Sequence, residues 1–92
     1  MDTEQTLEDI EITRKRLIFR SWHRGTREMD LLLGSFADKY APCFSAEELD
    51  EYDALLELSD PDLYSWISGA KETPANFVDG SVMQKLLKHR FA

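Results

Sequence analysis

Hydrophobic residues recur every three or four positions along most of this chain, the spacing that places them on one face of a helix. The first such segment spans about residues 10–22, and Gly25 then interrupts the pattern. A second helix is expected over about residues 26–40, because Pro42 cannot continue it. The inward positions are Leu17, Ile18 and Trp22 in the first segment and Met29, Leu32, Leu33, Phe36 and Tyr40 in the second.

The next two helices are marked by capping signals. Ser45 and Glu48 have the spacing of a capping box, in which each side chain satisfies a backbone N–H of the other residue. A third helix is therefore expected to follow Ser45. Asp60 stands directly before Pro61, so we expect Asp60 to cap a fourth helix whose first residue is the proline. Gly69 is expected to end that helix.

The end of the chain is expected to contain a loop and one more helix. Residues 71–76 include a proline and form the loop, and the helix follows over about residues 79–89. Since no stretch alternates for long enough to form a strand, the sequence predicts an all-α fold, a compact bundle of about five short helices. Residues 1–9 are predicted to be a mobile acidic tail and residues 10–92 a single helical domain. Its buried residues should include Leu17, Leu33, Phe36, Leu55 and Ile67.

Charged residues are separated along the sequence. The basic cluster comprises Arg14, Lys15, Arg16, Arg20, Arg24 and Arg27. The acidic cluster comprises Glu47, Glu48, Asp50, Glu51, Asp53, Glu57, Asp60 and Asp62. Such a polar molecule can steer the approach of a partner, and we expect Arg16, Arg20 and Arg24 to form the steering surface. The net charge of −7 disfavours nucleic-acid binding as the main function, because that binding draws affinity from cations that replace counterions.

Several other functional classes are disfavoured by what the sequence lacks. No apolar run approaches the roughly 20 residues of a membrane-spanning helix, so we expect no membrane insertion. Residues 1–11 resemble neither a signal peptide nor an Arg-rich transit peptide, which indicates a bacterial cytoplasmic protein or a mature organellar one. Cys43 has no partner for an internal disulfide, and two histidines, His23 and His89, argue against a zinc site. We expect Cys43 to be a packing residue and His89 to interact with the dipole of the last helix.

The chemically richest segment is the turn between the first two helices. It contains Trp22, His23, Arg24, Gly25, Arg27, Glu28 and Asp30. A purely structural interpretation is available, because Gly25 can supply a left-handed residue, and Glu28 and Asp30 favour the positive end of the second helix. The sequence contains no P-loop, dinucleotide-binding, serine-nucleophile or paired metal-ligand motif.

The run Arg24-Gly25-x-x-Glu28 resembles the R-G-x-x-E signature of the SdhE family, which includes the mitochondrial succinate dehydrogenase assembly factors. R-G-x-x-E is a weak motif alone, but here it lies between two helices and is followed by a D-P-D-L-x-x-W run, which makes the resemblance specific. It covers roughly residues 16–66. Its further matching residues are Met29, Asp30, Phe36, Ala37, Asp60, Pro61, Asp62, Leu63 and Trp66.

The resemblance implies a five-helix domain that binds the flavoprotein subunit of succinate dehydrogenase and promotes covalent attachment of FAD to a histidine of that subunit. The fumarate reductase flavoprotein is a further candidate partner. By this resemblance the chain itself does no covalent chemistry and holds no stably bound cofactor, since FAD is carried by the partner. We expect a monomer when the chain is free. The motif residues are Arg24, Gly25 and Glu28, and the expected partner-binding surface adds Arg20, Trp22, His23, Arg27 and Asp30.

Two other functions stay open on the sequence alone. The basic helix-turn region, residues 14–27, could imitate a helix-turn-helix that binds nucleic acid. His23 and Glu28 could form the base and the orienting carboxylate of an enzyme. In the partner-binding hypothesis, Gly25 admits a close partner backbone, and Arg24 and Glu28 make charge-assisted hydrogen bonds of ~1.5 to 3 kcal/mol each.

Overall fold

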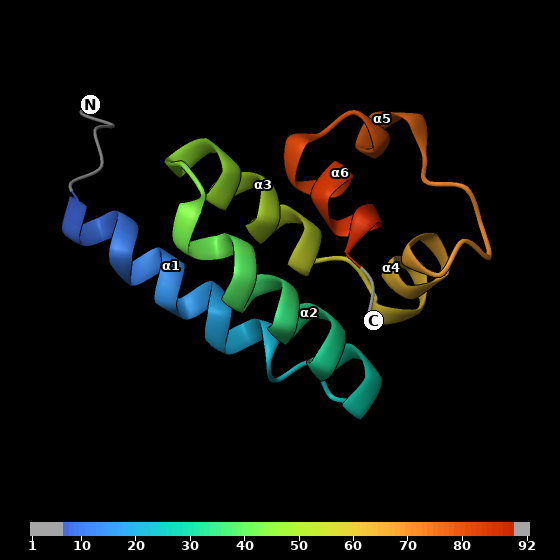
Figure 1. The fold of residues 1–92 in the computed structure, drawn as a ribbon, viewed down its shortest axis with the longest axis horizontal. Helices are drawn as coiled ribbons and strands as arrows, with labels where there is room; N and C mark the ends of the chain where they lie inside the picture. The colour runs from blue at the N-terminus through green and yellow to red at the C-terminus, as the bar shows by residue number, and fades with distance from the viewer. Residues whose placement is uncertain (1–6, 90–92) are drawn as a thin grey trace.

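The computed structural model describes residues 7–89, which form six α-helices and one 3-10 turn without any strand (Figure 1). The elements are α1 (Leu7–Ser21), α2 (Arg27–Tyr40), η1 (Ala41–Cys43), α3 (Ala46–Leu56), α4 (Asp60–Ile67), α5 (Ala75–Val78) and α6 (Ser81–Lys88). The predicted all-α class is confirmed, and α5 is one short helix more than expected. Residues 1–6 of the predicted acidic tail lie outside the described residues.

The helices pack around one core (Figure 1). α1 and α2 lie side by side and run in opposite directions, and α3 packs against α1. α6 contacts both α3 and α4, and the short α5 precedes α6 and packs on it. Because each amphipathic helix can hide its apolar face only against another helix, the core draws residues from α1, α2, α3, α4 and α6.

The predicted core residues are all confirmed. Leu17, Leu33 and Phe36 are fully buried, Leu55 is 2% exposed and Ile67 is 7% exposed. All of them belong to one hydrophobic cluster. The helical periodicity of the sequence therefore identified these buried positions correctly, whereas Trp22, which was also expected to face inward, is only partly buried and lies outside this cluster.

One polar pair is buried within this core. The hydroxyl of Ser21 donates to the carbonyl oxygen of Leu17 at 2.7 Å, and the hydroxyl oxygens of Ser21 and Tyr52 share a hydrogen bond of 2.6 Å. Burial raises the pKa of Tyr52 to about 12, so the phenol keeps its proton at neutral pH. The pair joins α1 to α3 through the interior of the bundle.

Two helix starts differ from the prediction, whereas a third is confirmed. α1 begins at Leu7, three residues earlier than expected, with two carboxylates in its first turn, where the helix dipole favours negative charge. α4 is capped by Ser59, whose Oγ accepts the N–H of Asp62 at 3.2 Å, so Asp60 is the first helical residue and not the cap. The predicted capping box of α3 is present with both of its hydrogen bonds.

The region between α4 and α6 also differs in part. Gly69 has a φ of 86° directly after α4, which confirms it as the glycine that ends this helix. Residues 75–76 of the predicted loop begin α5, because Pro74 can precede a helix that it could not continue from inside. Asp79 ends α5 and does not start the last helix, so α6 begins at Ser81.

Two expectations for single residues are wrong. Cys43, the last residue of η1, is exposed and not packed. His89 follows α6, with its Nε2 2.9 Å from Ser35 Oγ and its ring 5.6 Å from the ring of Phe36, edge to face. Burial and the charge of Lys39 lower the pKa of His89, which favours the neutral imidazole over the cation that a helix dipole would stabilise.

The N-terminus of α6 is held by two carboxylates of α3. Glu51 Oε2 accepts the backbone N–H of Val82 at 2.9 Å and that of Met83 at 3.3 Å. Glu48 accepts the hydroxyl of Ser81 at 2.9 Å in addition to the backbone N–H of its capping box. The capping-box N–H, followed by the Ser81 hydroxyl, lowers the pKa of Glu48.

We predict that acid weakens the attachment of α6 through Glu48. Because its folded-state pKa is lowered, Glu48 stabilises the fold above the ordinary value of 4.5 and loses this contribution as the pH falls through the folded-state value. Urea midpoints measured from about pH 6 to about pH 3 should fall less steeply for Glu48→Gln, which cannot ionise, than for the wild type. Parallel curves would contradict the assignment.

We predict that Leu33→Ala lowers the free energy of unfolding by ~2 to 5 kcal/mol, as removal of a buried large side chain does. Leu31→Ala is the matched control on the same helix, because Leu31 is 45% exposed and its loss should change stability by less than ~1 kcal/mol. Urea unfolding followed by circular dichroism measures both variants. Wild-type stability for Leu33→Ala would show that the packing is assigned incorrectly.

Candidate functional site

Residues 22–26 connect α1 to α2 in a tight turn. Gly25 has a φ of 124°, a region that favours glycine, so the predicted special backbone position is confirmed. No atom lies within 4 Å of the position that a Cβ would take there, so this side of the turn is open. Thr26 caps α2, and its Oγ1 accepts the N–H of Met29 at 3.3 Å.

Asp30 fastens the turn to the first part of α2. Its Oδ1 accepts the backbone N–H of Arg24 at 2.5 Å and that of Gly25 at 3.3 Å. Hydrogen bonds to a carboxylate are stronger than neutral ones, so these two bonds hold the glycine in its unusual conformation. Asp30, which was expected at the partner surface, is therefore already engaged within the chain.

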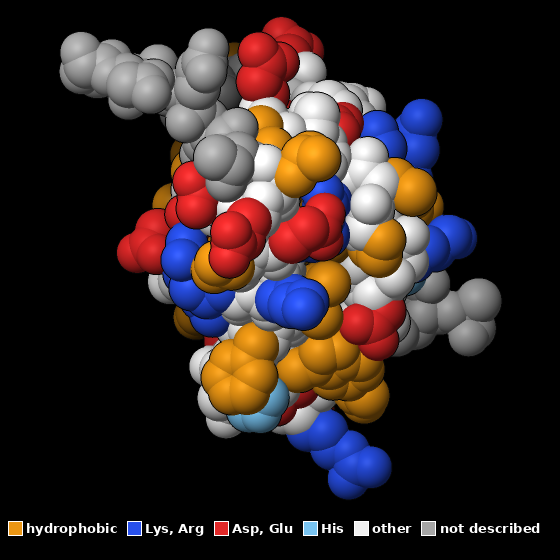
Figure 2. All heavy atoms as spheres, turned by 90° about the vertical axis from the view of Figure 1, so that its left-hand side faces the viewer, with side chains coloured by type: hydrophobic (Ala, Val, Ile, Leu, Met, Phe, Trp, Pro, Cys, Tyr) orange, Lys and Arg blue, Asp and Glu red, His pale blue; other side chains and the backbone are white. Residues whose placement is uncertain are grey.

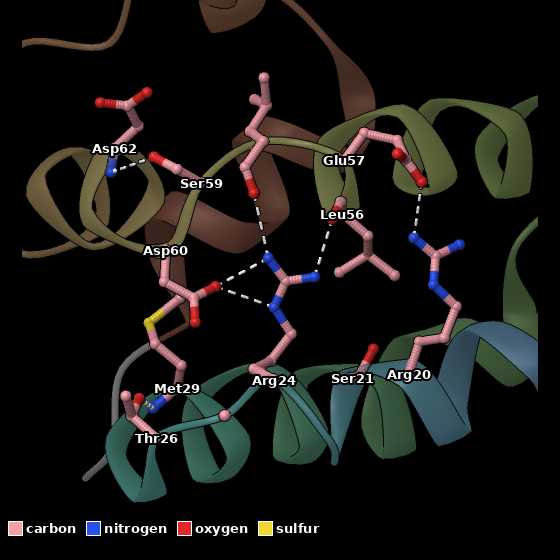
Figure 3. Close-up of polar contacts among 12 residues, drawn as sticks. Arg20, Ser21, Arg24, Thr26, Met29, Leu56, Glu57, Ser59, Asp60 and Asp62 are labelled. Carbon is pink, nitrogen blue, oxygen red and sulfur yellow. Dashed lines mark hydrogen bonds and ion pairs between the residues drawn. The ribbon is translucent and has the colours of Figure 1, made fainter.

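The side chain of Arg24 points into the junction between α3 and α4 (Figure 3). Its Nη1 donates to the carbonyl oxygen of Leu56 at 2.8 Å, and its Nη2 donates to that of Leu58 at 3.1 Å. Nε and Nη2 also reach Oδ1 of Asp60, at 2.9 and 2.7 Å. The side chains of Arg24 and Asp60 are 11% and 22% exposed, so this ion pair is largely shielded from water.

These bonds join three helix ends. Leu56 is the last residue of α3, where carbonyl groups lack partners within the helix and where a cation also opposes the negative end of the helix dipole. Asp60 is the first residue of α4. Since all three nitrogens of Arg24 are engaged, the guanidinium that was expected to contact a partner instead connects the end of α1 to α3 and α4.

Two more arginines of the basic cluster are used inside the chain. Nη1 of Arg20 lies 2.7 Å from Oδ1 of Asp53, and its Nη2 lies 2.8 Å from Oε2 of Glu57. The Asp53 carboxylate, together with Glu57, raises the pKa of Arg20. Arg14 donates to two carbonyl oxygens of the η1 region. Of the three arginines expected to steer a partner, only Arg16 has no hydrogen bond or ion pair within residues 7–89.

Trp22 and His23 have partners close to them. The indole of Trp22 packs on Gly34 of α2 so closely that a Cβ at Gly34 would lie 2.2 Å from its Cδ2, and Nε1 donates to Asp38 at 3.2 Å. The ring of His23 stacks on that of Phe19 at 4.0 Å, and its Nδ1 donates to the Phe19 carbonyl oxygen at 2.7 Å. Sequence reasoning missed the need for Gly34, although a glycine inside a helix was the available signal.

Two surface depressions flank the turn. The Trp22 depression has a volume of about 580 Å³ and is lined by Trp22, His23, Gly25, Thr26, Arg27, Asp30 and Leu31. The Glu28 depression has a volume of about 340 Å³ and is lined by Thr26, Glu28, Met29, Asp60 and Tyr64. Arg27 and Glu28 are exposed, and within residues 7–89 neither side chain makes a hydrogen bond or an ion pair. Each depression therefore carries one free charge.

The structure divides the predicted site residues by location. Five of the predicted site residues line the Trp22 depression: Trp22, His23, Gly25, Arg27 and Asp30. Glu28 lines the Glu28 depression, and Arg20 and Arg24 line neither of the two. Sequence reasoning missed Leu31 and Tyr64, which are 45% and 50% exposed. Leu31 directly precedes the buried Leu32, and Tyr64 directly follows the buried Leu63, so each falls outside the inward-facing pattern of its helix. A large apolar residue at such an outward position was the available signal in the sequence.

His23 and Glu28, considered above as a base and its orienting carboxylate, are not brought together. His23 and Glu28 line different depressions, and Nδ1 of His23 is bonded to a backbone carbonyl. Among residues 7–89, no group of three or more His, Cys, Asp or Glu side chains is arranged to hold a metal ion. In the same described part of the chain, every helix is too short or too polar to cross a membrane.

The fold and the site define a class, a small all-α protein whose first interhelical turn is fixed from within and exposed on its outer side. Residues 15–90 match the sequence model of the Sdh5 family, described as the flavinator of succinate dehydrogenase, and the chain belongs to this family. The resemblance drawn from Arg24-Gly25-x-x-Glu28 is therefore confirmed.

Similar curated proteins carry the name succinate dehydrogenase assembly factor 2, mitochondrial. The protein from Lodderomyces elongisporus is 42% identical over 88 residues, covering 92% of this chain and 54% of the relative. The protein from Debaryomyces hansenii is 51% identical over 63 residues, covering 68% and 44%. The 2-A form of the factor from Drosophila yakuba is 40% identical over 84 residues, covering 89% and 51%. The chain spans about half the length of the curated relatives it matches.

We predict that Arg24→Ala lowers the free energy of unfolding by about 2 to 4 kcal/mol, because it leaves Asp60 and two carbonyl groups without their shielded partner. Arg16→Ala is the matched control, an exposed arginine of the same basic cluster whose loss should change stability by less than ~0.5 kcal/mol. Urea unfolding of both variants provides the comparison. Equal stability of the two variants would contradict the structural role of Arg24.

Proposed function

We propose that this chain is an assembly chaperone that binds the flavoprotein subunit of succinate dehydrogenase and promotes covalent attachment of FAD to a histidine of that subunit. Membership of the family supports the connection to succinate dehydrogenase. The single observation that carries the proposal is the state of Glu28, an exposed carboxylate without a partner in residues 7–89, beside a turn whose backbone is fixed by Arg24 and Asp30.

The turn is suited to close contact with another protein. Gly25 has open space where a side chain would be, so a partner backbone can approach the turn without a steric conflict. Glu28 can accept charge-assisted hydrogen bonds from a partner's backbone or cationic side chain, worth ~1.5 to 3 kcal/mol each when water is excluded. Because the turn is fixed before binding, little conformational entropy is lost when the complex forms.

The proposed mechanism is positioning. FAD is carried by the partner, and this chain contributes binding energy that favours one arrangement of the partner's domains over another. In the favoured arrangement, the flavin ring and the partner histidine are held close enough to react. No covalent step and no stably bound cofactor is assigned to this chain, which is proposed to be a chaperone and not an enzyme.

The partner and the location are part of the proposal. The fumarate reductase flavoprotein is a further candidate partner. Its binding to the purified chain can be measured in the same way as that of the succinate dehydrogenase flavoprotein. The bacterial cytoplasm expected from the sequence stays a prediction, because the relatives described above are named as mitochondrial. A nucleic-acid role finds no support, since Arg14, Arg20 and Arg24 are bonded to the chain's own carbonyl and carboxylate groups.

We predict that Glu28→Ala stays folded but fails to support covalent flavin attachment in cells that lack the native factor. A carboxylate in the first turn of a helix contributes only ~0.3 to 1 kcal/mol to stability, so the melting temperature should change by a few degrees at most. Loss of a desolvated charge-assisted contact should weaken the complex by ~2 kcal/mol or more, roughly thirtyfold. In-gel flavin fluorescence of the denatured flavoprotein subunit measures the product.

Glu72→Ala is the matched control, because Glu72 is an exposed glutamate outside both depressions. This control should support wild-type levels of covalent flavin. Gly25→Arg should fail as well, but its effect mixes blocked approach with the strain of a positive φ, so Glu28→Ala is the cleaner variant. Normal covalent flavin with Glu28→Ala would remove the central residue from the proposal.

A further inference from the structure

We infer that the docking surface extends beyond the turn along the exposed face of α1, through an outer strip formed by Ile12, Arg16, Phe19 and His23. This strip fits a segment of the flavoprotein partner that carries carboxylates and apolar side chains. The inference rests on the proposed function, because it names a second part of the same interface. It adds residues that the R-G-x-x-E motif does not contain.

The strip begins on one face of α1 and continues into the turn. Ile12, Arg16 and Phe19 follow the spacing i, i+4 and i+7, which places them on one side of α1, and His23 of the turn stacks on Phe19. Ile12 is 54% exposed and Phe19 is 62% exposed, although α1 buries its apolar residue Leu17 completely on the other side. Figure 2 shows hydrophobic side chains exposed between acidic and basic ones, with a histidine directly against one of them.

Part of the basic cluster reaches the surface here without a partner among residues 7–89. Arg14, Arg20 and Arg24 are each bonded to backbone carbonyls or to carboxylates of the chain. Arg16 in the strip and Arg27 at the turn are exposed, and neither has a hydrogen bond or an ion pair within residues 7–89. Cations left without counter-charges on the same face as an exposed aromatic ring call for carboxylates on the partner.

The strip is also continuous with the proposed site. His23 stacks on Phe19 at 4.0 Å and at the same time lines the Trp22 depression. That depression adds the exposed side chains of Arg27 and Leu31 on α2. A partner segment that contacts Gly25 can therefore continue over His23 and Phe19 without leaving the surface. Apolar contact at the centre with charged contacts at its edges is the usual anatomy of a protein interface.

The occupant to which we commit is the flavoprotein subunit and not a second copy of this chain. The net charge of −7 makes two copies repel each other as they approach. A partner segment with carboxylates meets the unpaired arginines of this face, whereas its apolar side chains cover Ile12 and Phe19. Self-association through the strip is accordingly an outcome that the experiment must be able to detect.

The test measures the affinity and association rate of purified flavoprotein subunit, loaded with FAD, for wild-type chain, Phe19→Ala and Arg16→Glu. Loss of the exposed ring should weaken binding about tenfold, mainly by faster dissociation. Arg16→Glu should slow association several-fold at low salt and flatten its salt dependence.

Lys71→Glu is the matched charge-reversal control on an exposed loop residue outside the strip, and it should have a smaller effect. All three residues are exposed, so the melting temperatures should stay near that of the wild type.

Glu28→Ala, measured in the same assay, separates the two proposals. Weaker binding by Glu28→Ala together with wild-type binding by both strip variants would overturn the strip and leave the proposed function intact. No binding by the wild-type chain would overturn the proposed function, and the strip with it. Sedimentation of the free chain is the third arm: a dimer that Phe19→Ala dissociates would show that the strip binds a second copy, which contradicts the inference.

Discussion

The guanidinium of Arg24 is the group on which the turn between α1 and α2 depends most. Arg24 lies in the turn after α1, and it bonds the last carbonyl of α3, the carbonyl of Leu58 in the following linker and the first carboxylate of α4. Its backbone N–H is held at the same time by Asp30 of α2. The planar guanidinium of an arginine spreads its donors over three nitrogens and so reaches two carbonyls and a carboxylate together, whereas the three donors of a lysine all lie on one nitrogen. One residue of the turn is thus bonded to α2, α3 and α4, and the same Asp30 carboxylate also accepts the N–H of Gly25.

The separation of charge along the sequence is used mainly inside the fold. Arg14 and Arg20 of α1 and Arg24 of the following turn bond to η1, α3 and the start of α4. Their charges are neutralised by Glu11, Asp53 and Asp60 of the same chain. Exposed ion pairs of this kind contribute little each, and the shielded Arg24–Asp60 pair has the larger structural effect. Arg16 and Arg27 are the arginines of the basic cluster that have no partner among residues 7–89. The folded protein presents fewer free cations near the turn than its sequence suggests, and they lie beside exposed apolar side chains.

The parts of the fold that local chemistry determines could be predicted from the sequence. Helical periodicity found the buried faces, and the short-range signals of the capping box and of Gly25 were interpreted correctly. The Arg24–Asp60 contact could not be predicted in this way, because its partners lie 36 positions apart and only the packing of α4 brings them together. The same contact explains the error at α4: Ser59 performs the capping, and the carboxylate of Asp60 is turned to the arginine. Residues with several possible local roles were assigned wrongly where a distant partner decided the role.

The binding free energy that one contact can supply limits how much of the proposed function the motif alone can perform. Changing a partner from a mostly open to a mostly closed arrangement, from 1:99 to 99:1, requires about 5.5 kcal/mol of differential binding energy. A charge-assisted contact through Glu28 supplies ~1.5 to 3 kcal/mol, and Arg24 has no free nitrogen to add a second such contact. The remaining energy has to come from surfaces that contact only one arrangement of the partner. Exposed apolar side chains next to unpaired charges, as at Phe19 with Arg16 and at Leu31 with Arg27, are the groups near the turn that can provide it. A short motif and the energy needed for a chaperone are therefore reconciled when the motif sets the position of the complex and the surrounding face supplies most of its affinity.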